Sequence, residues 1–136
     1  QWDASINDGF STAKAEALYL PMDQEAGRPT VATQQEDPNS LLHFVRKLLK
    51  LRVAHPGLGI RGTYDILSPK DTPYPLVIQR ALEDQIYYIV LNPSDREQML
   101  DLHLSSEDLK DLLNDGVEFR EGKIISQAFS YAILLD

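Results

Sequence analysis

Residues 37–52 read DPNSLLHFVRKLLKLR, and this stretch decides the fold because it predicts the one long helix of the chain. Its apolar residues recur with a period near 3.6, and a His-Pro-Gly sequence at 55–57 ends the pattern. Asp37 is a suitable N-cap, and Pro38 suits the first helical position. We therefore expect a helix over residues 39–54, with an apolar stripe broad enough to need neighbours on more than one side.

Downstream of residue 59 the sequence changes to short runs of alternating polarity, which are typical of β-strands. Residues 105–109 instead predict an N-cap with one or two helical turns that end at 114–116. Seven short strands with frequent turns indicate an antiparallel β-sandwich, in a mainly β chain (α+β when the helix is included). The predicted strands are 63–68, 76–82, 85–91, 98–103, 117–119, 123–126 and 129–135, with tight turns at 83–84 and 121–122.

Residues 1–38 show no apolar period and are rich in Gly, Pro, Asn, Asp, Ser and Thr. An irregular stretch of this length is unusual inside a compact domain, so we expect a loop draped over a larger body. The apolar residues at 18–22 do not alternate as a strand would, and they are expected to pack on that body. The best domain boundary lies between His55 and Gly62, where the helical pattern gives way to strands.

The composition argues against several classes of protein. The chain has 136 residues, no cysteine and a net charge of −8, which excludes disulfides and thiolate metal sites and disfavours wholesale binding of nucleic acid. No run of 18 apolar residues predicts a membrane span, and the N-terminus does not read as a signal peptide. A first residue other than Met indicates a processed or truncated piece. The sequence does not fix the compartment, although the cytoplasm is favoured.

Three motifs occur in order along the first part of the chain: QWD at residues 1–3, GFST at 9–12, and the helical stretch at 37–52. In this order they resemble the C-terminal portion of the α-amylase family of glycoside hydrolases, and in particular its oligosaccharide branch of oligo-1,6-glucosidase, α-glucosidase and trehalose synthase. Those enzymes carry Pro-Met-Gln-Trp-Asp, then Gly-Phe-Thr-Thr, then Asp-Ser-Leu-Leu before a helix that ends in Leu-Arg. The chain departs from the family pattern at residues 17–21 and 22–25.

The resemblance implies that residues 1–58 are the end of a catalytic (β/α)8 barrel, namely the loop after its eighth strand and its eighth helix. Residues 59–136 would form the antiparallel C-terminal β-sandwich domain. The family's catalytic carboxylates all lie upstream of the Gln-Trp-Asp motif, so no catalytic residue is expected in this chain. The parent enzyme would cleave or transfer α-glucosidic bonds of short oligosaccharides by a retaining double displacement, and the barrel would be this chain's partner.

The residues themselves offer no catalytic group either. A retaining glycosidase needs two carboxyl groups about 5 Å apart. The acidic pairs at 36–37, 83–84 and 107–108 lie beside turns or helix starts, where solvated or capping acids are expected. Ser11 and Ser130 lack the Gly-x-Ser-x-Gly setting of a nucleophilic serine.

The candidates for substrate binding are Gln1, Trp2 and Asp3. Trp2 is the sole tryptophan, and its ring could stack on a sugar. A large amphipathic ring could equally anchor the loop on the barrel, which is the more common role. Asp3 is the only acid expected near a sugar, and it is not one of the family's catalytic acids.

No metal or cofactor is expected. The three histidines, His43, His55 and His103, lie far apart without an i, i+4 pair, which argues against a zinc site. Residues 57–62 read GLGIRG and superficially match a dinucleotide-binding motif. They follow a helix and precede a strand, which is the reverse of the order that motif requires.

Two other functions stay open. A carbohydrate-binding β module would need a row of exposed aromatic residues on one sheet face, whereas Tyr87, Tyr88, Phe129 and Tyr131 are scattered over the predicted strands. Alternation puts Tyr87 and Tyr88 on opposite faces. A protein-interaction module would use the helix at 39–54, whose apolar stripe could mediate self-association and whose basic face is expected to be solvated.

Overall fold

The computed structural model describes residues 1–23, 25–103 and 109–136. The chain divides into two compact units, Gln1–Lys50 and Leu51–Asp136. This division falls inside helix α2 (Leu41–Ala54), so the helix contributes residues to both units. The predicted boundary between a barrel segment and a C-terminal domain, at His55 to Gly62, stays a prediction.

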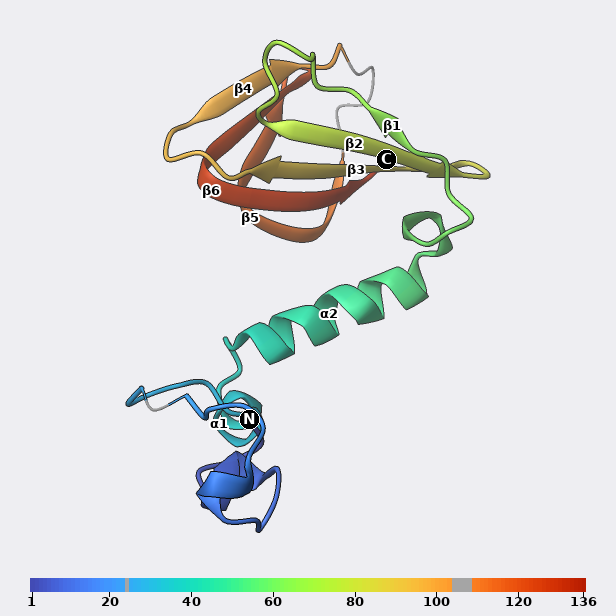
Figure 1. Cartoon of the computed structure of the whole chain (residues 1–136). Helices are drawn as coiled ribbons and strands as arrows, with labels where there is room; N and C mark the ends of the chain where they lie inside the picture. Colours follow the sequence, from blue (N-terminus) through green and yellow to red (C-terminus); the bar gives the residue numbers. More distant parts are fainter. Residues whose placement is uncertain (24, 104–108) are drawn as a thin grey trace. The chain divides into compact units, whose positions relative to one another are not determined.

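The described residues of the second unit form a six-stranded sheet in which every pairing is antiparallel, together with the end of α2 and one short helix (Figure 1). The strands are β1 (Asp65–Ile66), β2 (Leu76–Leu82), β3 (Gln85–Asn92), β4 (Gln98–Asp101), β5 (Lys110–Arg120) and β6 (Lys123–Leu135). β2 and β3 lie where the alternation predicted them, and the predicted turn at 83–84 joins them. β1 and β4 are shorter than predicted.

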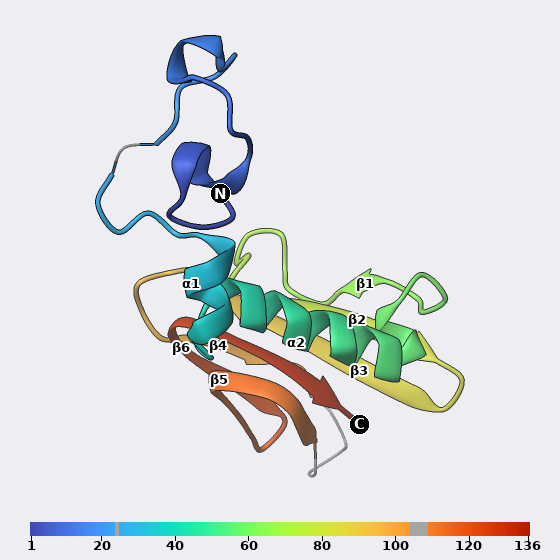
Figure 2. The same cartoon turned by 90° about the horizontal axis from the view of Figure 1, so that it is seen from below.

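Strand β6 organises the sheet because it pairs with three other strands. Its first part, residues 123–126, lies between β4 and β5. Its second part, residues 130–135, lies between β3 and β5. The strand order is therefore β1-β2-β3-β6-β4 with β5 also on β6, and Figure 2 shows β2 and β3 side by side in this sheet.

Apolar side chains from both parts of β6 meet in one core. β2 and β3 contribute to this core together with β5 and β6, so the sheet folds back around it. The core residues are Val77, Tyr88, Val90, Val117, Ile124, Ala132 and Leu134. The predicted mainly antiparallel β architecture is confirmed.

The prediction that a helical segment ends at 114–116 is wrong, because these residues belong to β5. The turn-forming residues there make a β-bulge instead of a helix end. Gly116 has φ +75°, and the Asn114 side chain bonds both backbone groups of Val117 across the bulge, at 3.0 Å to the N–H and 2.8 Å to the carbonyl. Residues 105–108 of the predicted turn lie outside the described residues.

The two strands predicted at 123–126 and 129–135 form one long strand, β6. Residues 127–129 lie opposite the bulge at Gly116 and separate the two parts, and Phe129 has φ +51° there. The backbone N–H of Phe129 donates to the carbonyl of Ser94 at 2.9 Å and not to a neighbouring strand. The sequence thus marked the break correctly, but the chain bends at that point without leaving the sheet.

Tyr87 and Tyr88 face opposite sides of β3, as alternation predicted, and both are buried. Tyr88 belongs to the core. Tyr87 lies under the short 3₁₀ helix η3 (Pro56–Leu58), where a Cβ on Gly57 would come within 2.4 Å of the Tyr87 ring. Burial raises the pKa of both hydroxyls, and the charge of Asp136 adds to the effect on Tyr88.

The first unit contains short helices joined by loops. The elements are η1 (Ile6–Gly9), η2 (Ala15–Ala17), α1 (Val31–Glu36) and the first residues of α2. The prediction of an irregular segment over residues 1–38 missed α1, which is only six residues long. A capping box holds its start: the N–H of Thr33 donates to the Thr30 hydroxyl at 3.1 Å, and the N–H of Thr30 donates to the Thr33 hydroxyl at 3.1 Å.

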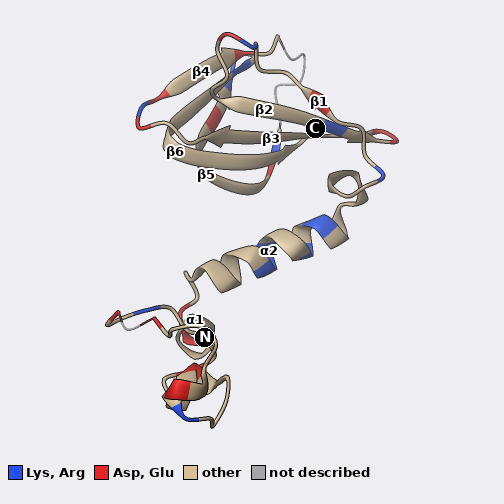
Figure 3. Ribbon diagram, viewed as in Figure 1, with Lys and Arg blue, Asp and Glu red and all other residues tan. Residues whose placement is uncertain are grey.

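Helix α2 confirms the predicted helix but begins later than its predicted start. Asp37 is not its N-cap; that carboxylate accepts from the N–H of Asn39 at 2.9 Å in the preceding turn. Ser40 precedes the helix, and its hydroxyl oxygen accepts from the N–H of His43 at 3.4 Å. The charged residues of α2 are all Lys or Arg (Figure 3), and none of its residues is buried.

Candidate functional site

The site begins with a tight loop in the first unit, where Asn7, Asp8 and Gly9 take left-handed conformations in succession. Asn and Asp tolerate this region better than other residues with side chains, and Gly is free to adopt it. At Gly9 a Cβ would lie 2.9 Å from the Cβ of Trp2, so the loop also needs a residue without a side chain there. The Asn-Asp-Gly sequence is therefore a local cause of this turn.

The Asn7 side chain fixes the chain that follows this loop. Its Nδ2 donates to the carbonyl of Ser11 at 3.0 Å, to the hydroxyl of Ser11 at 3.2 Å and to the carbonyl of Ala13 at 2.8 Å. One amide thus fixes residues 11–13 to the turn.

The Gln-Trp-Asp motif lies between this loop and α1. The N–H of Trp2 donates to the carbonyl of Asp8 at 2.9 Å. The carbonyls of Gln1 and Trp2 accept from the first N–H groups of α1, those of Val31 and Ala32, at 3.0 and 2.9 Å. Because a helix N-terminus has unpaired N–H groups, the motif's backbone supplies partners that α1 would otherwise lack.

An ion pair joins the loop to the segment before α1. The Arg28 guanidinium donates to a carboxylate oxygen of Asp8, and the two side chains are 27% and 4% exposed. The hydrogen bond to Asp8 raises the pKa of Arg28 above its ordinary value. The second carboxylate oxygen of Asp8 and the Nε of Arg28 are buried without a hydrogen-bond partner among the described residues.

This ion pair lines a cavity of about 470 Å³ in the first unit. Its lining combines the pair with apolar residues from 15–22. The lining residues are Ser5, Asn7, Asp8, Ala15, Leu18, Leu20, Pro21, Met22 and Arg28. A cavity of this size with a few converging polar groups is typical of a small-ligand site.

Trp2 and Asp3 lie beside this loop. The Trp2 side chain is 56% exposed, so its ring is accessible to a ligand. The Asp3 carboxylate accepts from both the N–H and the hydroxyl of Ser5, and these hydrogen bonds lower its pKa. Asp3 is therefore an anion held in a turn, without the raised pKa that a general acid needs. The binding roles of Gln1, Trp2 and Asp3 stay a prediction.

The three histidines each make contacts with nearby protein groups. His43 bonds the carbonyl of Gln35 at 3.1 Å, His55 lies edge-on to Tyr87, and His103 pairs with Asp101 at 3.0 Å. Residues 107–108 lie outside the described part of the chain. Within the described ranges, no group of three His, Asp or Glu side chains is arranged to hold a metal ion.

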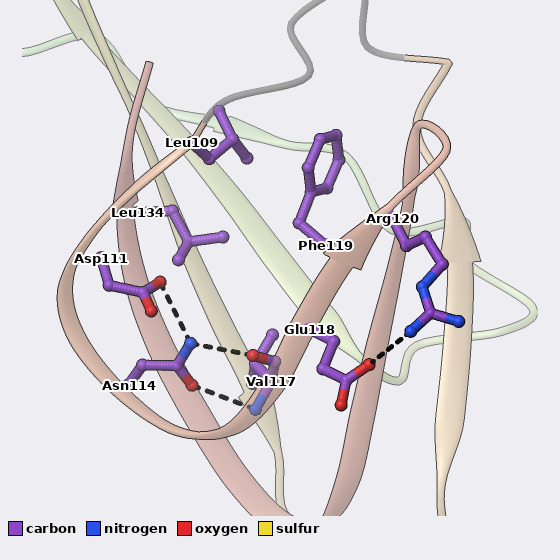
Figure 4. Close-up of a pocket in the computed structure, with 8 residues that line it drawn as sticks. All are labelled: Leu109, Asp111, Asn114, Val117, Glu118, Phe119, Arg120 and Leu134. Carbon is purple, nitrogen blue, oxygen red and sulfur yellow. Dashed lines mark hydrogen bonds and ion pairs between the residues drawn. The ribbon is translucent and has the colours of Figure 1, made fainter.

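A second cavity, of about 340 Å³, lies along β5 in the second unit (Figure 4). The Asn114 amide points into it, but its atoms bond Val117 and the Asp111 carboxylate. Glu118 and Arg120 at its edge form an exposed pair at 3.7 Å. The Asn114 amide is thus engaged in holding the bulge, Glu118 and Arg120 pair with each other, and we assign no ligand to this cavity.

Sequence reasoning missed the ion pair and the cavity. The Asn-Asp-Gly turn was a readable signal, because these three residue types in succession favour left-handed backbone. Nothing in the sequence indicated that Asp8 pairs with a residue 20 positions away.

Comparison with known proteins decides the family. The chain is 33% identical over 96 residues to oligo-1,6-glucosidase of Parageobacillus thermoglucosidasius, and 34% identical over 110 residues to trehalose synthase of Thermus thermophilus. The chain belongs to the α-amylase family of glycoside hydrolases, and it matches the C-terminal portion. The matched segments are 71% and 78% of this chain but only 16% and 11% of those relatives. No protein-family model matches the chain.

Solved structures share the fold. Trehalulose synthase MutB from Pseudomonas mesoacidophila MX-45 matches 100% of this chain and 24% of its own, with a TM-score of 0.77 and 21% identity. Eubacterium rectale Amy13B matches 88% of the chain with a TM-score of 0.67 and 22% identity. In the described part of the chain, no helix has the length and apolar character that a membrane crossing requires.

Proposed function

We propose that this chain is the C-terminal part of a retaining glycosidase or glucosyltransferase that acts on α-glucosidic bonds of short oligosaccharides. The observation that carries the proposal is the sequence match, over most of the chain, to both an oligo-1,6-glucosidase and a trehalose synthase. A MutB structure in complex with its substrate sucrose has the same fold over the whole of this chain. In this proposal residues 1–58 complete the catalytic barrel and residues 59–136 form the C-terminal domain.

The chain by itself is proposed to be non-catalytic. A retaining mechanism needs a nucleophile and an acid/base about 5 Å apart. Among the described residues Asp8 is the one buried acid, and its carboxylate is paired with Arg28. The catalytic acids are therefore assigned to the part of the relatives that this chain does not match.

Within that enzyme, the first unit would supply a wall of the substrate site. Loops that follow barrel strands build the active-site face of a (β/α)8 barrel. The backbone of Gln1 and Trp2 is fixed between a rigid turn and α1, which leaves the exposed Trp2 ring and the Gln1 and Asp3 side chains to meet a sugar.

Two assays test the proposal. The purified chain, given p-nitrophenyl α-glucoside and isomaltose, should show no turnover; turnover that survives repurification would overturn the non-catalytic assignment.

The chain should also restore activity when it replaces the matching segment of the Parageobacillus oligo-1,6-glucosidase. In that chimera Trp2→Ala should raise KM more than Trp2→Phe does, and an inactive but folded chimera would count against the family role.

Helix α2 is proposed to dock on the barrel of the same enzyme. Its exposed apolar residues lie at i, i+4 spacing and so form one stripe: Leu41, Val45, Leu49 and Val53. Covering a Leu or Val side chain stabilises by about 1.5–3 kcal/mol. Without a barrel, the chain should self-associate through this stripe.

Light scattering with matched variants tests this docking. Leu49→Gln should dissociate the assembly, whereas Lys47→Gln, on the same helix, should not. A chain that is monomeric at all concentrations, and whose thermal melt is the same with Leu49→Gln, would contradict the docking of α2.

A further inference from the structure

An uncharged cleft of about 470 Å³ lies in the second unit, where β2 begins and β3 ends. None of its lining residues carries a charge, although 25% of the chain is charged. Three of them are aromatic: Tyr74, Phe129 and Tyr131. The structure thus brings Tyr74 beside two aromatic residues that lie more than 50 positions further along the sequence.

The strand register builds the floor of this cleft. Leu76 of β2 pairs with Leu91 of β3, and Leu91 pairs with Tyr131 of β6. Directly paired residues point to the same face of a sheet, so these three side chains form one row. Asn92 and Ser130, the residues beside them, also line the cleft and are buried, and strand alternation directs their side chains to the opposite face.

The walls of the cleft come from loops at the end of the sheet. Tyr74 lies just before β2 and is 44% exposed. Phe129 is 69% exposed and lies at the bend in β6 with φ +51°. A left-handed conformation is unfavourable for a bulky residue, and strain of this kind collects at functional sites. The bend therefore holds an exposed aromatic ring beside the Leu91 and Tyr131 floor.

A buried amide holds the wall in place. The Nδ2 of Asn92 donates to the carbonyls of Arg96, Ser126 and Gln127 at 2.9, 3.1 and 2.7 Å. Its Oδ1 accepts from the N–H of Ser94 at 3.1 Å and from the hydroxyl of Ser94. All the hydrogen-bonding groups of this amide are used inside the protein. Asn92 therefore shapes the cleft, and contact with a ligand falls to the aromatic and apolar side chains.

We propose that this cleft binds a pyranose ring of a neutral α-linked gluco-oligosaccharide. The C–H faces of such a ring pack on aromatic rings, its hydroxyls need no charged partner, and the volume suits one or two sugar units. A charged peptide or a nucleic acid would find no counter-charge in this lining. The choice of α-glucose units rests on the proposed function, whereas the aromatic and uncharged chemistry rests on the cleft alone.

Titration of the ¹⁵N-labelled chain with maltotriose and isomaltotriose, followed by NMR, tests the proposal. Saturable shifts should concentrate on the backbone N–H groups of Leu91, Phe129 and Tyr131. Sorbitol, an acyclic polyol, should cause no saturable shift. The absence of saturable shifts with either trisaccharide, or shifts confined to Gln1–Lys50, would overturn the proposal. The turnover assays would be unaffected, so failure here is distinguishable from failure of the proposed function.

Matched variants assign the binding to the cleft. Phe129→Asn removes the ring while keeping a residue that tolerates the left-handed backbone, and it should weaken binding about tenfold. Tyr64→Asn removes an exposed aromatic residue outside the cleft and should leave the affinity unchanged. Leu91→Glu places a charge on the floor without touching the bend in β6, and it should abolish binding. Affinity that survives both cleft variants would refute the assignment.

Discussion

The two units bury different kinds of side chain. In the described part of Gln1–Lys50 the buried residues are Asp8, Thr30 and Ser40, which are all polar. In Leu51–Asp136 a connected set of apolar side chains from β2, β3, β5 and β6 forms a buried core. The first unit is thus shaped by hydrogen-bonded turns, and the second by apolar packing.

This contrast teaches where each unit obtains its stability. Burying apolar area is the dominant favourable term in folding, so the second unit has the means to fold alone. The first unit leaves large apolar residues in solvent, with Tyr19 98% and Leu20 68% exposed. That pattern agrees with the proposal that residues 1–38 rest on a catalytic barrel, and it implies that the units will respond differently to the same kind of mutation.

The largest effect should come from the core of the second unit. Ile124 is fully buried, and Ile124→Ala should lower the free energy of unfolding by about 2–5 kcal/mol, because the cavity adds to the lost burial. Its neighbour Ile125 points to the other face and is only half-buried, so Ile125→Ala should cost less. Urea unfolding followed by far-UV circular dichroism gives both values.

The same urea titration tests whether the two units unfold independently. The sole tryptophan, Trp2, lies in the first unit, and its fluorescence should report that unit alone. We expect Ile124→Ala to move the circular dichroism transition without moving the fluorescence transition. A common shift in both signals would show that the two units unfold together.

A smaller loss of stability should distinguish substitutions at two asparagines that donate the same number of hydrogen bonds. Asn92 and Asn7 each donate to three oxygens, but Asn92 is buried and Asn7 is half-buried. Asn92→Asp would turn a donor into an anion facing three carbonyls, at a cost of at least about 1–3 kcal/mol. In Asn7→Asp solvent relieves part of that penalty. Equal losses in thermal melts would mean that burial does not distinguish the two networks.

A third comparison, within the first unit, separates the cost of a steric contact from the cost of left-handed backbone. Gly9 and Gly27 both have left-handed backbone, with φ +77° and +86°. Ala costs roughly 1–2 kcal/mol in this region. Gly9→Ala would in addition bring a Cβ within 2.9 Å of the Trp2 Cβ, whereas a Cβ on Gly27 would meet no atom of the described residues within 4 Å. Hydrogen exchange at the Trp2 N–H should therefore accelerate more in Gly9→Ala than Gly27→Ala accelerates exchange at the Arg28 N–H.

Prediction from sequence succeeded where one periodic pattern determined an element. The alternation over 76–91 gave β2, β3 and their turn, and the 3.6 period gave α2. It failed where turn-forming residues lie inside an element. Asn114 and Gly116 favour a helix end locally, but pairing with β6 absorbs them as a bulge. The six residues of α1 are too few to show a period, and hydrogen bonds from a distant motif support their start.

The limit of prediction from sequence is clearer for the candidate sites. The Gln-Trp-Asp motif could be read as a unit because its residues are consecutive. The pairing of Asp8 with Arg28, and the gathering of Tyr74, Phe129 and Tyr131 into one cleft, depend on strand register and loop closure. Register follows from the whole sheet and not from any of these residues, which is why the aromatic residues looked scattered in the sequence.

The smallest effect concerns the turn that Asp3 forms with Ser5. It tests the polar contacts of the first unit directly, because only exposed hydrogen bonds hold this turn. The hydroxyl and N–H of Ser5 lower the pKa of Asp3 below its ordinary value of 3.8. A carboxyl with a depressed pKa contributes stability that is present above its unfolded pKa and is lost as pH falls through its folded pKa, so this turn should loosen only below about pH 3.8. In an NMR pH titration, Ser5→Ala should raise the pKa of Asp3, whereas Ser11→Ala should leave it in place because the Ser11 hydroxyl bonds Asn7 instead. An Asp3 pKa that is the same in the Ser5→Ala variant would mean that the turn is not formed in solution, and the first unit would then lack one of the polar contacts that distinguish it from the second.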